Sequence, residues 1–288
     1  MAASYNRATQ DIGNIVGLEH VNVTIPDQRP ATAFYLAGMG FTRDPYIMVG
    51  LENMWVNIGR SQCHLPNGKP QVLRGTIGIV VPDLAQLAER LKKVSPWLKD
   101  TKFGFQAHAD RVEATCPWGN RFRCHAPSPE FGATELGLPY VEFEVPRGSA
   151  EGIARFYREA LHATAAVEQR GGNAMASVEA GADQKLLFCE TDSELPPYDN
   201  HHIQIYIADF SGPHRFLLER GLITEESNPH QYRFRDIVDI DSGKVLFTIE
   251  HEVRSLRNPL YARPLVNRNP AQTNNNYVHG QDGFRGTY

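Results

Sequence analysis

Two segments near the end of the sequence carry side chains that could bind a cation or move a proton. In NHHIQIYI, His202 alternates with Gln204 and Tyr206, and in KVLFTIEHEV, Glu250 alternates with Glu252. If both segments are strands, alternation places each set on one face of a sheet. Buried polar groups are costly unless they are solvated, paired or bound to an ion. This face therefore indicates a polar-ligand or metal site, or else an open, solvated sheet.

An earlier segment, GLPYVEFEVPR, has the same pattern. Tyr140, Glu142 and Glu144 alternate there with apolar residues. We expect them to share a face with His202, where either carboxylate could complete a ligand set. Tyr140 itself is an uncommon metal ligand, because its neutral phenol is a poor electron donor.

These segments belong to a unit that occurs four times. Each unit consists of a strand, a helix and three further strands, and the opening strands align on His20, Thr76, Tyr140 and His202, roughly 56 to 64 residues apart. Such a regular period indicates a repeated supersecondary unit. One such unit leaves a sheet face bare, so units should pair. The predicted fold class is α+β, with four βαβββ modules paired into two cupped mixed-sheet domains.

We expect consecutive modules to pair, because the turn-rich stretch SPEFGATELG separates the second module from the third. The predicted organisation is an N-terminal arm at 1–14, a first two-module domain at 15–127, a second at 138–253, and an extended C-terminal arm at 254–288.

The C-terminal arm has five arginines and one acidic residue, a charge of roughly +4. Its spaced apolar residues, among them Leu260, Tyr261, Leu265, Val266 and Tyr277, predict that it packs over the domains or against a partner subunit. We therefore expect a homo-oligomer.

The composition limits the kind of partner. A formal net charge of -4 and the lack of a long basic run argue against nucleic acid as the main partner. No segment approaches the roughly 18 to 20 apolar residues of a membrane span, and the polar start lacks a signal-peptide segment. The four cysteines form no CxxC pair. We expect a cytoplasmic protein with reduced cysteines that binds a small molecule.

The segments LEHVNVTIPD, SQCHLPNGKPQVLRGTIGIVVPDLAQLAERL and CPWGNRFR resemble the vicinal oxygen chelate superfamily. This superfamily includes glyoxalase I, bleomycin and fosfomycin resistance proteins, methylmalonyl-CoA epimerase and the extradiol dioxygenases. The resemblance covers about residues 15–252, and a two-domain, four-module chain is most similar to the extradiol dioxygenases. It implies a divalent ion in the cleft, held by the first and last strands of paired modules. Two histidines and one carboxylate would suit Fe(II) or Mn(II).

In the second domain the resemblance implies that His202 and Glu250 hold the metal, with Glu142 or Tyr140 completing the set. The other candidates there are the catalytic residues Tyr206 and Tyr140 and the substrate-binding residues Gln204 and Glu252.

In the first domain, His20 and His64 occupy positions where the resemblance implies ligands, but Thr76 and Arg123 stand where the second module should supply the others. A guanidinium has no lone pair to offer and repels a divalent ion. We therefore expect this domain to be metal-free. It is then either a structural pseudo-domain or an anion pocket, in which Arg123 binds substrate together with His20 or His64.

The predicted function is a metal-dependent vicinal oxygen chelate enzyme, dioxygenase-like or glyoxalase-like, acting on a small substrate with neighbouring oxygen atoms. Two alternatives remain open. One is a metal-free binding or resistance-type protein, which the residues Thr76, Arg123 and Tyr140 favour. The other is a metal-independent isomerase or lyase that uses Glu142 and Glu250 as acid and base.

Overall fold

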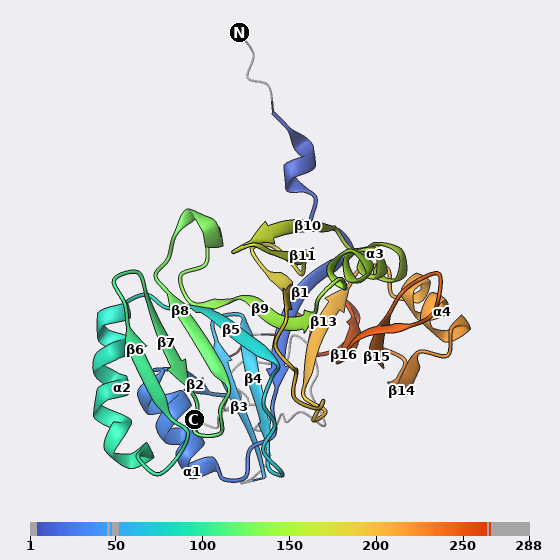
Figure 1. Cartoon of the computed structure of the whole chain (residues 1–288). Coiled ribbons are helices and arrows are strands. Elements are labelled where there is room, and N and C mark those ends of the chain that lie inside the picture. Colours follow the sequence, from blue (N-terminus) through green and yellow to red (C-terminus); the bar gives the residue numbers. More distant parts are fainter. Residues whose placement is uncertain (1–4, 45–46, 48–51, 264, 266–288) are drawn as a thin grey trace, which may run out of the picture.

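The computed structural model describes residues 5–44, 47, 52–263 and 265, and it contains all four predicted modules (Figure 1). Module one comprises β1 (Ile15–Asn22), α1 (Gln28–Ala31) with its continuation η2 (Thr32–Gly38), β2 (Thr42–Arg43), β3 (Asn53–Ile58) and β4 (Ser61–Pro66). Module two comprises β5 (Gly75–Val80), α2 (Leu84–Leu98), β6 (Gly104–Ala107), β7 (Arg111–Thr115) and β8 (Arg121–His125).

The second half of the chain repeats this order. Module three comprises β9 (Gly137–Pro146), α3 (Ala150–Leu161), β10 (Ala165–Arg170), β11 (Asn173–Glu179) and β12 (Lys185–Thr191). Module four comprises β13 (His202–Ile207), α4 (Ser211–Glu219), β14 (Ile223–Asn228), β15 (Gln231–Val238) and β16 (Val245–Ser255). Two short 3-10 helices lie outside the modules, η1 (Arg7–Gln10) before β1 and η3 (Pro129–Phe131) between β8 and β9.

The modules pair into two eight-stranded mixed sheets, which confirms the predicted fold class. The first sheet joins modules one and four in the order β14-β15-β16-β13-β1-β4-β3-β2. The second sheet joins modules two and three in the order β10-β11-β12-β9-β5-β8-β7-β6. In each sheet the two opening strands run antiparallel at the centre, and each has the last strand of its own module as a parallel neighbour.

The expected pairing of module one with module two, and of module three with module four, is therefore wrong. The linker after β8 leads into β9 of the same sheet, where Gly137 lies opposite Val80 of β5. It thus connects two halves of one sheet instead of separating two domains at 15–127 and 138–253. Modules one and four, at opposite ends of the chain, meet through β1 and β13.

The helices cover one face of the sheets because their apolar residues recur at helical spacing. In α2 the buried residues Leu87, Leu91, Val94 and Leu98 form such a stripe, and the Asp83 carboxylate caps its first turn by accepting from the Gln86 N–H at 2.9 Å. One apolar cluster joins the helices to the facing sides of both sheets. Among the described residues, no helix is both long and apolar enough to cross a bilayer.

Both predicted arms are described in part. Before β1, the Asn14 side chain donates to the Leu161 and Asp209 carbonyl oxygens at 2.8 and 3.1 Å. After β16, Tyr261 packs edge-on against Tyr206, and Leu260 packs against a small apolar cluster beside β3. The start of the C-terminal arm therefore packs on the first sheet, as predicted. Val266 and Tyr277 lie outside the described residues.

A buried hydrogen bond joins α3 to the last strand of module four. The His251 Nδ1–H donates to the Ile249 carbonyl at 2.8 Å, so its Nε2 accepts from the Tyr157 hydroxyl at 2.5 Å. Both side chains have no exposed surface, and the His251 ring stacks on Phe234 with centroids 4.3 Å apart.

We predict that Tyr157→Phe lowers the free energy of unfolding by about 1 to 3 kcal/mol, because it leaves a buried imidazole nitrogen without a partner. Urea unfolding followed by circular dichroism measures this. Tyr5→Phe is the matched control, since Tyr5 is 69% exposed. Equal losses of unfolding free energy in the Tyr157→Phe and Tyr5→Phe proteins would contradict a stabilising role for the hydrogen bond between Tyr157 and His251.

Candidate metal centre

The first sheet brings three histidines together on the face turned away from the helices. Val21, Ile203 and Ile205 point into the apolar core, so strand alternation turns His20 and His202 the other way. His64 joins them from β4. One ligand nitrogen from each ring lies within 4.8 Å of the others. His20 is 5.8 Å, centroid to centroid, from both His64 and His202.

Backbone register explains why these rings converge. In the antiparallel pair β1–β13, Asn22 lies opposite His202 and His20 lies opposite Gln204. In the parallel pair β1–β4, Asn22 lies opposite His64. His202 and His64 therefore both lie opposite Asn22, on the strands to either side of β1, and His20 is two residues from Asn22 along β1.

The same register places Glu252 beside the three histidines, although its carboxylate lies outside their 4.8 Å cluster. An approximate twofold relation between modules one and four exchanges His20 with His202 and Asn22 with Gln204. Asn22 has His64 opposite it on β4, and Gln204 has Glu252 opposite it on β16. Glu252 thus occupies the position in module four that His64 occupies in module one. Its Oε2 is 3.6 Å from His202 Nε2.

Glu250 was the predicted carboxylate ligand, and the register places it one strand pair away. It lies opposite His202, and its Oε1 is 3.7 Å from His202 Nδ1, the nitrogen on the other side of the ring from Glu252. It also accepts from Arg233 at 2.6 Å. Glu250 therefore flanks the group, while Glu252 occupies the position equivalent to His64.

The hydrogen bonds leave a lone pair on each of two rings. His20 Nδ1 donates to Glu19 Oε2 at 3.3 Å, so Nε2 keeps its lone pair. His64 Nε2 donates to Asn53 Oδ1 at 2.7 Å, which leaves Nδ1 as the basic nitrogen. Within the described part of the chain, His20 Nε2 and His202 Nε2 are buried without a hydrogen-bond partner. The neighbouring Gln204 amide is also buried without one, as is the Asn22 side-chain oxygen.

Glu19 reaches His20 because β1 contains an irregularity. The register between β1 and β13 shifts between Leu18 and His20, so Glu19 is the extra residue of a bulge. Regular alternation would place Glu19 on the face opposite His20. The bulge lets it accept from His20, from the Tyr206 hydroxyl at 3.0 Å and from Arg254 at 3.1 Å.

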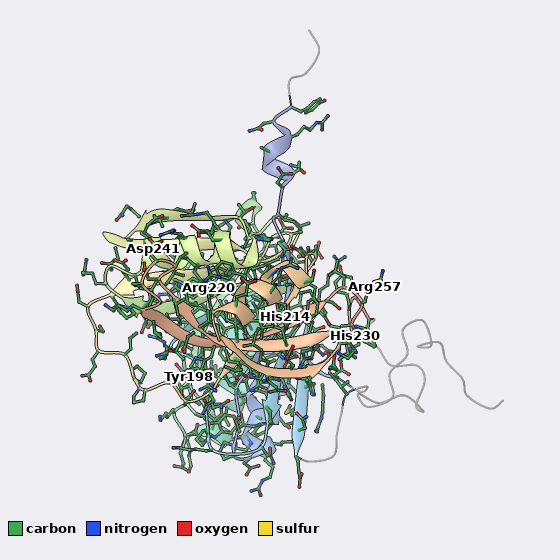
Figure 2. The ribbon with its side chains drawn as sticks, turned by 90° about the vertical axis from the view of Figure 1, so that its right-hand side faces the viewer. Tyr198, His214, Arg220, His230, Asp241 and Arg257 are labelled. Carbon is green, nitrogen blue, oxygen red and sulfur yellow. The ribbon has the colours of Figure 1, made fainter. Side chains whose placement is uncertain are left out.

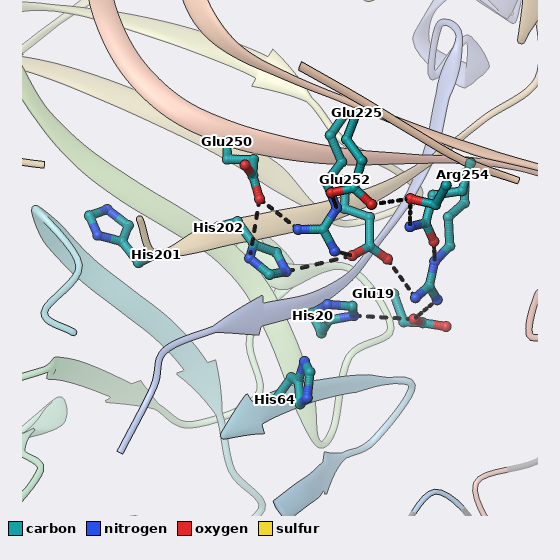
Figure 3. A network of polar contacts seen from close by, with 12 residues as sticks. Glu19, His20, His64, His201, His202, Glu225, Glu250, Glu252 and Arg254 are labelled. Atoms are coloured by element: carbon teal, nitrogen blue, oxygen red, sulfur yellow. Dashed lines mark hydrogen bonds and ion pairs between the residues drawn. The ribbon is translucent and has the colours of Figure 1, made fainter. Parts of the chain in front are cut away.

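Charge in this group is concentrated in a chain of ion pairs (Figure 3). Arg254 Nη2 lies 2.5 Å from Glu252 Oε1, and Arg233 binds the other Glu252 oxygen as well as Glu250. Three carboxylates with little exposed surface pair with the two guanidiniums of Arg233 and Arg254. They are those of Glu19, Glu250 and Glu252. With neutral histidines, the group has one negative charge in excess.

Burial keeps the His64 and His202 imidazoles neutral, and neighbouring cations keep the Glu252 carboxylate charged. Removal from water lowers the pKa of His64 and of His202 well below their usual value. Burial tends to raise the pKa of Glu252, but the Arg254 and Arg233 guanidiniums outweigh it and hold that pKa well below its usual range. Neutral imidazoles and an ionised carboxylate are the forms that bind a metal ion. Aromatic packing also fixes His64, whose ring stacks on Trp55 with centroids 3.8 Å apart.

Comparison with solved structures shows where this arrangement of strands recurs. Glyoxalase I from Zea mays is 16% identical and superposes with a TM-score of 0.57 over 83% of this chain and 92% of its own. A candidate dioxygenase from Bacillus subtilis is 13% identical, with a TM-score of 0.55 over 85% of this chain and 86% of its own. The chain shares the fold of these two proteins. No family profile and no curated protein match its sequence.

The second sheet lacks the corresponding ligands. Its register places Thr76, Tyr140, Arg123 and Leu187 at the positions of His20, His202, His64 and Glu252. Two predicted site residues therefore lie away from His202. Tyr140 bonds to His125 at 2.8 Å, and Glu142 pairs with Arg123 and Arg170. The predictions that Tyr140 or Glu142 completes the set around His202 are wrong, because β9 and β13 belong to different sheets.

The reasoning that led us to expect a metal-free first domain, which placed Thr76 and Arg123 beside His20, is wrong for the same reason. Thr76 and Arg123 belong to the second sheet and do not face His20. Its neighbours across the strands come from module four and from β4. The predicted anion pocket combining Arg123 with His20 or His64 is excluded by the same separation.

Sequence reasoning missed Glu19 and Arg254, which support this group from outside. Regular alternation would place Glu19 on the face opposite His20. The C-terminal arm was predicted to begin at Arg254, although β16 extends to Ser255. The predicted catalytic residue Tyr206 is 3% exposed and donates to Glu19. Burial raises its pKa well above the usual value, so the phenol stays protonated. In this position Tyr206 orients Glu19.

We predict that Arg254→Gln lowers the free energy of unfolding by about 3 to 5 kcal/mol, because two buried carboxylates lose their common partner. Arg158→Gln is the matched control. Its partner Glu151 is on the surface, where such a pair contributes about 0 to 1 kcal/mol. Urea unfolding measures both variants, and a loss below about 1 kcal/mol for Arg254→Gln would contradict the network's role.

Proposed function

We propose that the protein is a metal-dependent enzyme whose ion is held by His20, His64, His202 and Glu252. The observation that carries this proposal is the convergence of three histidines, one ring nitrogen of each within 4.8 Å of the others, together with His20 Nε2 and His202 Nε2, which are buried without a hydrogen-bond partner. Buried polar atoms without partners are rare and call for a missing ligand. The excess negative charge of the group favours a cation. Three imidazoles and one carboxylate suit Fe(II) or Mn(II), as the sequence predicts.

The chain's own residues would position the ion and its substrate. Glu19 fixes the tautomer of His20 and orients its ring, as carboxylates commonly do behind metal-bound histidines. Arg233 and Arg254 keep Glu252 ionised and fix its direction. Four protein ligands on a six-coordinate ion leave positions for two substrate oxygens. When bound, the ion would polarise those oxygens and stabilise the charge that develops on them.

The proposed donor set suits one class of substrate. A small molecule with neighbouring oxygen atoms could use both open positions, and both dioxygenase-like and glyoxalase-like reactions act on such molecules. Support for this class comes from the shared fold together with the donor set. Thr76, Arg123 and Tyr140, which favoured a metal-free binding protein, belong to the second sheet and have no bearing on the ligands of the first.

Metal analysis tests the ion. Protein purified without chelators should contain about one equivalent of a transition metal by mass spectrometry. His202→Ala should lower this at least about tenfold, since it removes a ligand. His230→Ala is the control, because His230 lies at the turn between β14 and β15 (Figure 2) and is not one of the proposed ligands. Less than about a tenth of an equivalent, unrestored by added Fe(II) or Mn(II), would refute the proposal.

Oxygen uptake separates the two kinds of reaction. With catechol as a probe diol, a dioxygenase-like enzyme consumes one O₂ for each substrate molecule, whereas a glyoxalase-like reaction on a 2-oxoaldehyde adduct consumes none. We expect either turnover to stop on adding EDTA and to return with metal. Turnover that is unaffected by removal of the metal would instead support an acid–base isomerase or lyase.

A further inference from the structure

The second sheet has a cleft of its own. Its volume is about 430 Å³, within the range of small-molecule sites. Side chains from β7, β8, β9, β10 and β12 line it. The cleft lies on the inner face of the second sheet. The positions there that correspond to the proposed ligands of the first sheet are occupied by Thr76, Tyr140, Arg123 and Leu187.

Positive charge exceeds negative charge in this cleft. Arg111, Arg123 and Arg170 line it together with Glu113 and Glu142. Both carboxylates are already paired. Glu142 accepts from Arg170 at 2.6 Å and from Arg123 at 3.3 Å, and Glu113 accepts from Arg111 at 3.0 Å. His125 adds no charge near neutral pH, because burial lowers its pKa.

Arg123 is the cation best placed to bind a ligand. Its side chain is 25% exposed on β8, opposite Gly78, where the Tyr140 ring fills the space that a side chain on residue 78 would take. A guanidinium carries five N–H donors in a planar fork that fits a carboxylate. In the described part of the chain, its shortest ion-pair contact is the 3.3 Å contact with Glu142, and the contact with Glu113 is 3.9 Å. The fork therefore retains donors for an incoming anion.

An apolar surface lies beside these cations. Tyr140, Met175 and Leu187 form a small buried cluster with Phe131, and the cleft residue Cys189 packs against it. Phe131 also packs against the His125 ring, with centroids 4.8 Å apart. The cleft thus has a cationic lining that meets a buried apolar cluster at Cys189, which suits an anion with a small apolar part.

We propose that the inner face of the second sheet binds a small organic carboxylate bearing a ring or a short apolar chain. Arg123 receives the carboxylate together with Arg170, and the ring lies toward Met175 and Leu187. The proposal is independent of the metal centre, because the residues concerned belong to the other sheet. A site of this kind would let one chain hold two different small molecules.

Benzoate is a suitable probe, and benzamide is its neutral isostere. Binding is measured by isothermal titration calorimetry on the full chain, both as purified and after EDTA treatment, because a carboxylate could also bind a metal in the first sheet. We expect one benzoate site that survives EDTA. Benzamide should bind at least about tenfold more weakly, since it cannot form a charge-assisted bidentate pair.

Variants locate the site. Arg123→Gln should weaken benzoate binding at least about tenfold, and Arg170→Gln provides a second, independent variant. Arg29→Gln is the matched control, as its side chain is 90% exposed and far from the cleft in sequence and sheet. Circular dichroism and thermal unfolding verify that each variant is folded.

The outcomes separate this proposal from the metal proposal. Binding that survives EDTA and weakens in both cleft variants supports the carboxylate site, whatever the metal content. Binding that disappears with EDTA places the carboxylate on the metal and overturns the proposal. Equal binding by the Arg123→Gln, Arg170→Gln and Arg29→Gln proteins, or no benzoate site at all, overturns it as well.

Discussion

The antiparallel contact between β1 and β13 determines which side chains meet in the first sheet. Asn22 opposite His202 and His20 opposite Gln204 set a register that β4 and β16 then extend on either side. A slip of one residue in this contact would turn the whole polar set of β13 toward the core. The apolar residues on the other face, such as Ile203 and Ile205, prevent this because they are fully buried. Core packing therefore holds the three histidines in position.

The two sheets share one architecture but carry opposite charge on their inner faces. The first presents three histidines and an excess carboxylate, and the second presents an excess guanidinium at the equivalent positions. His64 in one sheet corresponds to Arg123 in the other, and Glu252 corresponds to Leu187. A neutral imidazole can donate a lone pair, and a guanidinium cannot. One fold can thus present a cation site on one sheet and an anion site on the other.

Much of this arrangement is readable from the sequence. The period of the repeat predicts four modules, and the alignment of their opening strands predicts that His20 and His202 occupy equivalent positions. The sequence does not show which modules pair, because every opening strand has the same pattern and could form the central antiparallel pair with any other opening strand. Periodicity could not choose between Glu250 and Glu252, because it identifies a face and leaves the register between neighbouring strands open. Glu19 was missed since a bulge breaks the alternation on which the prediction relied.

The union of modules one and four has a consequence for how the protein is made. A ribosome releases the chain from its N-terminus, so β5 and β9 are both available to each other while β13 is still unsynthesised. Module one must then wait with a bare strand edge until nearly the whole chain has emerged. Glu19, His20 and His64 acquire His202 and Glu252 as neighbours only at that late stage. A polypeptide cut short before β13 would keep its second sheet and never assemble the histidine cluster.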